Sequence, residues 1–155
     1  MYLNIPPMTS NHPLSILIVD DEIELASLYR TYLEESGYNV VSFTDPLLAI
    51  EYYKQNIKRF THVLTDLRMP HMSGIELASK IRKLNRKVKL FLITAFTIDD
   101  LKNNKEFANA RIEMVIEKPV RLKTLKEYLN NAILSNNTDG KIEENLEQNL
   151  RPNQI

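Results

Sequence analysis

Short, uniformly apolar stretches alternate along the chain with longer stretches in which apolar residues recur every three or four positions. The first apolar stretch, residues 15–19, has the length and composition of a strand that is buried on both faces. Four further stretches share this pattern. The five predicted strands are residues 15–19, 39–43, 62–65, 88–94 and 114–116.

The segments between these strands carry the helical period. Apolar stripes begin at Ile23, Ile75 and Leu122, and Pro46 is a residue suited to the first turn of a helix. A weaker and more polar helix is predicted over residues 99–108. Because every strand is followed by one helix, we expect parallel strands with helices on both faces of the sheet.

This alternation defines the predicted domain organisation. An α/β, doubly wound, five-stranded domain is predicted over residues 14–134. Residues 1–13 contain three prolines and no periodicity, which indicates a flexible leader. Residues 135–155 are polar and acidic. They are predicted to form a disordered tail, because the three regularly spaced apolar residues Ile142, Leu146 and Leu150 cannot offset the entropy lost on ordering the segment.

Composition and charge narrow the range of functions. The 155 residues include no cysteine, which excludes disulfides and Cys-ligated metal sites. Twenty basic and twenty acidic residues balance, so overall charge gives no support to polyanion binding. The basic residues between positions 80 and 89 are expected to form a solvated face. We find no targeting signal or membrane-length apolar run, and we expect a cytoplasmic protein without a membrane partner.

Acidic side chains follow two of the predicted strands at the point where each strand ends. Asp20 and Asp21 follow the first strand, and Asp66 follows the third. The carboxyl ends of parallel strands share one edge of the sheet, and the switch point of a doubly wound sheet would separate these two strands. Three carboxylates so close together repel one another unless a cation lies among them. A Mg²⁺ site formed by these three residues is therefore predicted.

Two further polar residues are expected at the same edge. Thr94 ends the fourth strand, and Lys118 follows the fifth. An ammonium group and a hydroxyl beside Mg²⁺ suit a phosphoryl group, which they would neutralise and hydrogen-bond. Asp66 would then serve as the nucleophile and form an aspartyl phosphate. Each residue alone is common in turns and on surfaces, so the prediction depends on their combined order, each at its own strand's end.

Four motifs thus stand in a fixed order along the chain. They are Ile16-Leu17-Ile18-Val19-Asp20-Asp21-Glu22, Asp66-Leu67-Arg68-Met69-Pro70-His71-Met72-Ser73-Gly74, Thr94-Ala95 and Lys118-Pro119. Together they resemble the receiver domain of two-component response regulators. The resemblance implies a flavodoxin-like (βα)5 fold with strand order 2-1-3-4-5. It also implies that Asp66 accepts a phosphoryl group contacted by Thr94 and Lys118. The implied Mg²⁺ ligands are Asp20, Asp21, Asp66 and the backbone carbonyl of Arg68.

The chain departs from the family's pattern at one position and is distinctive at two others. Receivers normally carry an aromatic residue three positions before the lysine, as part of their switch, and here that residue is Val115. No ring can therefore swing from an exposed to a buried place at this position. The two positions that tune phosphoryl lifetime in the family are occupied by Arg68 and Phe96. We expect both to hinder the attacking water and prolong the phosphorylated state.

The resemblance favours a single-domain response regulator that catalyses only its own phosphorylation and dephosphorylation. A sensor histidine kinase would donate the phosphoryl group, and the modified surface would bind a downstream protein. Only 22 residues follow Ile133, too few for a DNA-binding effector domain, so no direct DNA binding is expected. One alternative is a degenerate receiver that acts as a phosphorylation-independent scaffold; the complete set of site residues counts against it, and Val115 keeps it open. A less favoured alternative is a phosphohydrolase with an Asp nucleophile.

Overall fold

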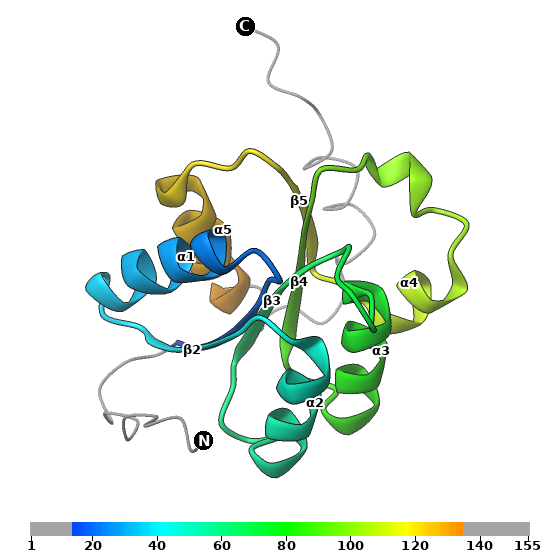
Figure 1. The fold of residues 1–155 in the computed structure, drawn as a ribbon, viewed down its shortest axis with the longest axis horizontal. Helices are drawn as coiled ribbons and strands as arrows, with labels where there is room; N and C mark the ends of the chain where they lie inside the picture. Colours follow the sequence, from blue (N-terminus) through cyan, green and yellow to red (C-terminus); the bar gives the residue numbers. More distant parts are fainter. Residues whose placement is uncertain (1–13, 135–155) are drawn as a thin grey trace, which may run out of the picture.

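Five parallel strands form one sheet in the order β2-β1-β3-β4-β5 (Figure 1). The computed structural model describes residues 14–134. The predicted α/β fold class and the flavodoxin-like strand order are both confirmed. The strands are β1 (Ser15–Val19), β2 (Asn39–Phe43), β3 (His62–Asp66), β4 (Lys89–Thr94) and β5 (Met114–Glu117).

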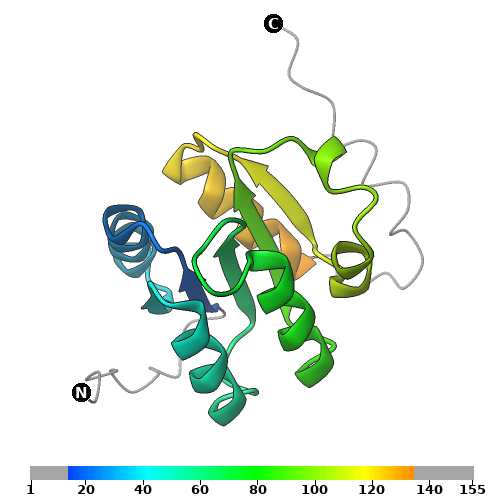
Figure 2. The same ribbon diagram turned by 45° about the vertical axis from the view of Figure 1, so that its right-hand side comes forward.

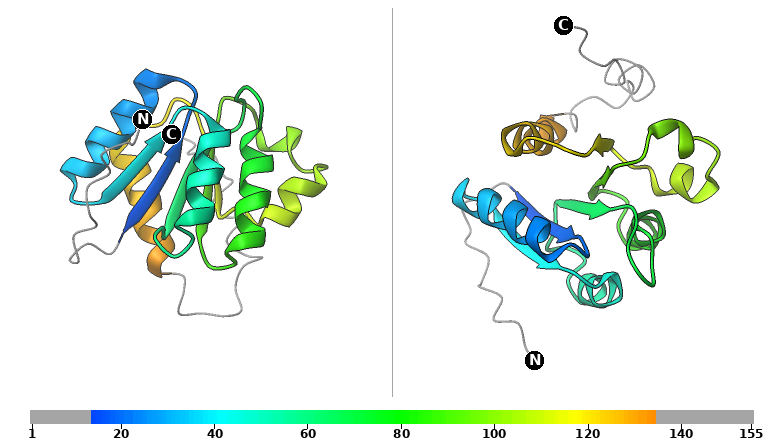
Figure 3. Two further views of the ribbon diagram at one scale, coloured as in Figure 1. Left: turned by 60° about the horizontal axis from the view of Figure 1, so that its bottom comes forward. Right: turned by 45° about the horizontal axis from the view of Figure 1, so that its top comes forward.

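Helices cover both faces of this sheet. One face carries α1 and α5, which lie side by side, and the opposite face carries α2, α3 and α4 (Figures 1 and 3). This is the two-sided covering that strict alternation of strands and helices predicts. The bounds are α1 (Ile23–Glu35), α2 (Pro46–Gln55), α3 (Gly74–Leu84), α4 (Lys105–Ala110) and α5 (Leu122–Leu134).

The central strand β1 is buried on both faces, as its uniformly apolar sequence predicts. Leu17 packs into the cluster formed with α2 and α3, whereas Ile18 packs into the cluster formed with α1 and α5. In the parallel register, Ile18 is aligned with Ser42 of β2 and Leu64 of β3. The strand ends immediately before Asp20, so burial of β1 determines where the first acidic motif begins.

Side-chain caps begin two of the helices that follow strands. At α2, Asp45 Oδ1 accepts a hydrogen bond from the Leu47 N–H at 2.8 Å, and Pro46 occupies the first turn as predicted. At α3, Ser73 Oγ accepts a hydrogen bond from the Glu76 N–H at 3.2 Å. Each cap satisfies a backbone donor that has no partner within its own helix.

The helix predicted over residues 99–108 is wrong, because two shorter elements occupy this part of the chain. A 3-10 turn (Ile98–Asp100) precedes the six-residue helix α4. Asn104 separates the two elements: its side-chain oxygen accepts a hydrogen bond from the Phe107 N–H at 3.1 Å and caps α4. Asparagine favours caps over helix interiors. Figure 2 shows the chain reaching outward between β4 and α4.

The basic stretch between residues 80 and 89 is not a uniformly solvated face. The Arg82 guanidinium donates hydrogen bonds to the backbone carbonyl oxygens of Val88 at 2.8 Å, Ala110 at 2.8 Å and Arg111 at 3.1 Å. A guanidinium presents several donors in a fixed plane and can satisfy many carbonyl groups at once. Arg82 therefore fastens the end of α3 to the end of α4.

The two predicted flanking segments, residues 1–13 and 135–155, lie outside the described residues. The predicted domain boundaries therefore stay predictions. Within residues 14–134, no helix combines the length and the apolar composition needed to cross a membrane.

Candidate functional site

The carboxyl ends of four strands bring the predicted site residues together at one edge of the sheet. Asp20 follows β1, Asp66 ends β3 and Thr94 ends β4, and these three side chains are buried. Asp21 lies beside Asp20 and is half-buried, as is Lys118, which follows β5. Buried polar groups of this kind need partners, which here are Lys118 for the two buried carboxylates and a nearby backbone N–H for each of the three buried side chains.

Three carboxylates form the acidic part of the site. Asp20, Asp21 and Asp66 each offer an oxygen, and these oxygens lie within 4.8 Å of one another. Two backbone donors orient them: the Glu22 N–H donates to Asp20 Oδ1, and the Leu67 N–H donates to Asp66 Oδ1, both at 2.9 Å. These donors do not cancel the repulsion between the carboxylates. Oxygen ligands arranged in this way fit a hard divalent cation such as Mg²⁺.

Lys118 brings a positive charge to the same place. Its Nζ lies 3.4 Å from Asp66 Oδ1 and 3.5 Å from Asp20 Oδ2. It also lies 3.6 Å from Glu22 Oε1, a contact that the sequence pattern did not predict. The Lys118 backbone N–H donates a hydrogen bond to the Thr94 carbonyl oxygen at 2.8 Å. This bond positions the Lys118 backbone beside the end of β4.

Burial and neighbouring charges raise the pKa values of Asp20, Asp66 and Lys118. Burial raises the pKa of Asp20 and of Asp66, because a desolvated carboxylate loses hydration that Lys118 only partly replaces. Burial alone would lower the pKa of Lys118. The carboxylates of Asp20, Asp66 and Glu22 outweigh this and raise it. Lys118 is therefore charged at neutral pH. Its single ammonium group cannot neutralise all of the carboxylates around it.

The backbone of Asp66 lies directly under the start of α3, and Gly74 makes this close approach possible. A Cβ atom at position 74 would lie 1.9 Å from the Asp66 carbonyl oxygen. No side chain can occupy that space without moving the backbone. The Gly74 N–H also donates to the Leu67 carbonyl oxygen at 2.8 Å. Gly74 therefore holds the loop that follows Asp66 against the first turn of α3.

Arg68 and Phe96, the two residues expected to modulate the site, contact each other across the loops after β3 and β4. The Arg68 guanidinium carbon lies 3.7 Å from the centroid of the Phe96 ring, a cation–π contact. The Phe96 N–H donates to Thr94 Oγ1 at 3.0 Å, which connects the ring's backbone to the buried hydroxyl. Phe96 and Val115 pack against one apolar cluster, which contains Leu92.

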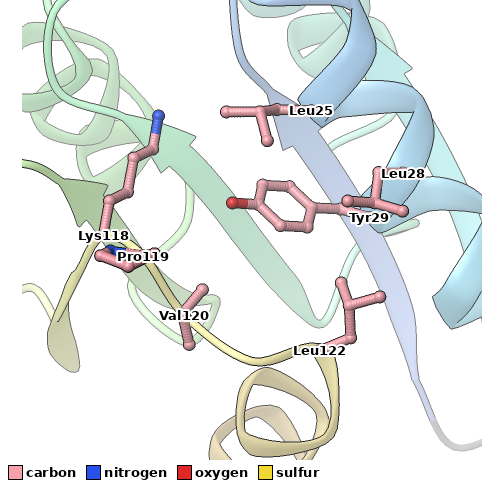
Figure 4. Close-up of a pocket in the computed structure, with 7 residues that line it drawn as sticks. All are labelled: Leu25, Leu28, Tyr29, Lys118, Pro119, Val120 and Leu122. Atoms are coloured by element: carbon pink, nitrogen blue, oxygen red, sulfur yellow. The ribbon is translucent and has the colours of Figure 1, made fainter.

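The sequence pattern did not assign one polar group at this edge, the hydroxyl of Tyr29. The Tyr29 side chain belongs to α1, and its hydroxyl points across a groove towards the Lys118 side chain (Figure 4). Burial raises the pKa of Tyr29 above its ordinary value, so the hydroxyl is protonated at neutral pH. Helical spacing identifies Tyr29 as a core residue, as its burial confirms, but spacing carries no information on where the hydroxyl points.

A comparison with known families accounts for this set of residues. Residues 16–130 match the family described as the response regulator receiver domain. The chain belongs to this family. All of the site residues described above lie within the matched part of the receiver, so its resemblance to two-component response regulators is confirmed.

Known proteins carry this receiver both alone and within longer chains. The receiver protein CpdR of Brucella abortus is 29% identical over 120 residues, which cover 77% of this chain and 97% of that protein. A cyclic di-GMP phosphodiesterase of Thermotoga maritima is 32% identical over 120 residues, which cover 77% of this chain but 31% of that protein. The present chain spans only 10% of the sensor protein EvgS of Escherichia coli.

A solved structure adds a chemical detail. The response regulator TrrA of Thermotoga maritima, crystallised in complex with Mg²⁺ and BeF, is 27% identical to this receiver with a TM-score of 0.65. The alignment covers 76% of this chain and 97% of that structure.

Proposed function

We propose that this receiver accepts a phosphoryl group on Asp66 from a sensor histidine kinase and then signals through contacts with a downstream protein. One observation carries the proposal: three carboxylate oxygens lie within 4.8 Å of one another, and an ammonium nitrogen lies 3.4 Å from Asp66. A negative cluster with one fixed cation suits the binding of a metal ion together with a phosphoryl group. Membership of the receiver family supports the same reaction.

Mg²⁺ is the proposed cofactor. Asp20, Asp21 and Asp66 would hold the ion, and the backbone carbonyl of Arg68 would complete the protein ligands. The donor set supports this assignment, because it consists of buried or half-buried oxygens with too little positive charge nearby. When bound, the ion supplies positive charge that reduces the repulsion between the carboxylates and a phosphodonor. The complex of TrrA with Mg²⁺ and BeF also supports it.

The three reacting side chains would have separate roles. Asp66 Oδ1 is already engaged by the Leu67 N–H and by Lys118, which leaves the other carboxylate oxygen as the nucleophile. The Lys118 ammonium would pair with an oxygen of the transferred group. The Thr94 hydroxyl would donate a hydrogen bond to another oxygen. The receiver would thereby catalyse only its own phosphorylation and dephosphorylation.

The proposed output is a change in binding to another protein. The match to CpdR, of which this chain covers 97%, supports a receiver that acts without an attached effector domain. Direct binding to DNA forms no part of the proposal. The proposed location is the cytoplasm, where a sensor kinase would present its phosphoryl group.

The contact between Arg68 and Phe96 supports a long-lived phosphorylated state. The guanidinium carbon of Arg68 lies 3.7 Å from the Phe96 ring centroid, and we expect this pair to hinder an in-line water that attacks the phosphoryl group. We expect Arg68→Ala and Phe96→Ala to shorten the phosphoryl half-life several-fold. Phe107→Ala is the control, because that ring packs against the same cluster from α4. A half-life that shortens little in both test variants would contradict this role.

The first test is intact mass after incubation with acetyl phosphate, with and without Mg²⁺. We expect one added phosphoryl group that requires Mg²⁺ and is lost in Asp66→Asn. Asp99→Asn, on the exposed 3-10 turn, should react like the wild type. The absence of both an adduct and Mg²⁺ binding would favour a phosphorylation-independent scaffold. Continuous turnover of an external phosphoester would favour a hydrolase.

A further inference from the structure

A groove opens between α1 and the connection from β5 to α5, and it shares Lys118 with the acidic site. Its volume is about 380 Å³, which is within the range of small-molecule pockets. Apolar side chains form most of the lining (Figure 4). From α1 come Leu25, Leu28 and Tyr29, and from the other wall come Lys118, Val120 and Leu122.

Two polar groups interrupt this apolar lining. Lys118 belongs both to the groove and to the acidic centre, with its Nζ 3.4 Å from Asp66. Tyr29 faces it from the opposite wall (Figure 4). Only 4% of the Tyr29 side chain is exposed, and within residues 14–134 no hydrogen bond engages its hydroxyl. A buried tyrosine hydroxyl normally finds a partner, so this donor is available to a molecule in the groove.

We propose that the groove holds the leaving group of a phosphodonor and that Tyr29 is a donor-binding residue, its hydroxyl hydrogen-bonding an acceptor atom of that group. The inference rests on the proposed phosphorylation of Asp66. The leaving group must be small, partly apolar and able to accept a hydrogen bond. Two sources share this chemistry: the carboxylate of an acyl phosphate and the imidazole ring of a phosphohistidine.

The proposed step is balanced for an acyl phosphate. A carboxylate oxygen of Asp66 attacks phosphorus, and the bond between phosphorus and the acyl oxygen breaks. The electron pair of that bond leaves with the carboxylate, so the reaction needs no oxidant and no proton. For a phosphohistidine or phosphoimidazole ring protonated at its other nitrogen, the electron pair of the broken phosphorus–nitrogen bond stays on the departing nitrogen, and the ring leaves as neutral imidazole. Charge develops on the departing oxygen. A donated hydrogen bond from Tyr29 stabilises that charge, and the leucine side chains cover the apolar part of the group.

The placement of Tyr29 predicts selectivity among phosphodonors. Acetyl phosphate and phosphoimidazole have leaving groups that combine an apolar part with a hydrogen-bond acceptor. Phosphoramidate releases ammonia, which neither fills the groove nor needs the same donor. Removing the hydroxyl in Tyr29→Phe should therefore lower the second-order rate constant of adduct formation about three- to tenfold for the first two donors, the effect of one hydrogen bond. The rate with phosphoramidate should change less than about twofold.

The experiment measures the initial rate of adduct formation on the full chain by intact mass, with each of the three donors and Mg²⁺. Tyr32→Phe is the matched control, because it removes a hydroxyl one turn further along α1, and its rates should equal those of the wild type. An equal loss with all three donors, or no loss with any, would overturn the inference. If the wild type forms no adduct with any donor, the proposed phosphorylation itself fails. A difference between acetyl phosphate and phosphoimidazole would identify which source the groove prefers.

Discussion

Acidification should destabilise this receiver through one buried histidine, His62, at the start of β3. The side chain is 2% exposed, and its ring stacks on Phe91 with the centroids 5.7 Å apart. Nε2 lies 3.0 Å from the Leu129 carbonyl oxygen, so Nε2 carries the proton of the neutral ring and joins β3 to α5. Nδ1 lies 2.8 Å from the Thr61 hydroxyl. In the neutral ring Nδ1 can only accept, and it shares the single Thr61 hydroxyl proton with the Ser15 carbonyl oxygen, 3.1 Å from Thr61 Oγ1.

The size of the effect follows from the change in protonation on folding. Burial is the largest influence on His62 and lowers its pKa from 6.5 to about 4. The folded protein therefore holds the proton less tightly than the unfolded chain. The contribution of neutral His62 to stability is fully present above the unfolded pKa and is lost as the pH falls from 6.5 towards 4. At about 1.4 kcal/mol per pH unit, the loss is roughly 2 kcal/mol at pH 5 and 3 kcal/mol at pH 4.

Urea unfolding followed by circular dichroism measures this loss, with His62→Gln as the variant. A glutamine amide can still donate a hydrogen bond but cannot become charged. Between pH 7.5 and pH 5, the free energy of unfolding of the wild type should fall by about 2 kcal/mol more than that of His62→Gln. The exposed His71 provides the control, since His71→Asn should follow the wild type at every pH. Parallel losses in the wild type and His62→Gln would refute the reasoning.

Three other variants and one control test separate parts of the structure. Gly74→Ala should lower the free energy of unfolding by about 1–3 kcal/mol in urea, because the new methyl group collides with the Asp66 carbonyl oxygen. Arg82→Met should cost roughly 2–4 kcal/mol in the same assay through the lost carbonyl hydrogen bonds. The control is Lys83→Met, at the exposed residue that follows Arg82, and it should change the free energy of unfolding by less than about 0.5 kcal/mol. Lys118→Met should abolish adduct formation in the mass assay while Mg²⁺ binds more tightly in calorimetry, because a competing cation has been removed.

Sequence alone was sufficient to predict the sheet and most members of its polar edge, with Glu22 and Tyr29 as the exceptions. β1 illustrates why: a strand buried on both faces has to be uniformly apolar, so its end is visible as the change from Val19 to Asp20. The same reasoning located Asp66 and Thr94 at the ends of β3 and β4. Parallel strands then force these residues onto one edge, whatever the details of the loops.

What the sequence did not reveal depends on contacts between segments far apart in the chain. Arg82 resembles any other lysine or arginine in a basic stretch, and only the folded chain places the Ala110 carbonyl oxygen 2.8 Å from it. The break before α4 depends on whether Asn104 continues a helix or caps one, and both are compatible with the local pattern. The Tyr29 hydroxyl is a third example, because α1 must first be packed beside α5 before the groove exists.

The polar edge carries a net negative charge that no side chain of the site neutralises. Asp20, Asp21 and Asp66 face one ammonium group, so when all are ionised the centre carries more negative than positive charge. A dianionic phosphodonor would be repelled by this centre. A divalent cation held by these carboxylates would offset their excess charge, and Lys118 could then pair with the oxygens of an incoming phosphoryl group. The fold thus supports this edge through Gly74 and the backbone donor of Leu67, while its net negative charge favours a cation and disfavours an anion that arrives without one.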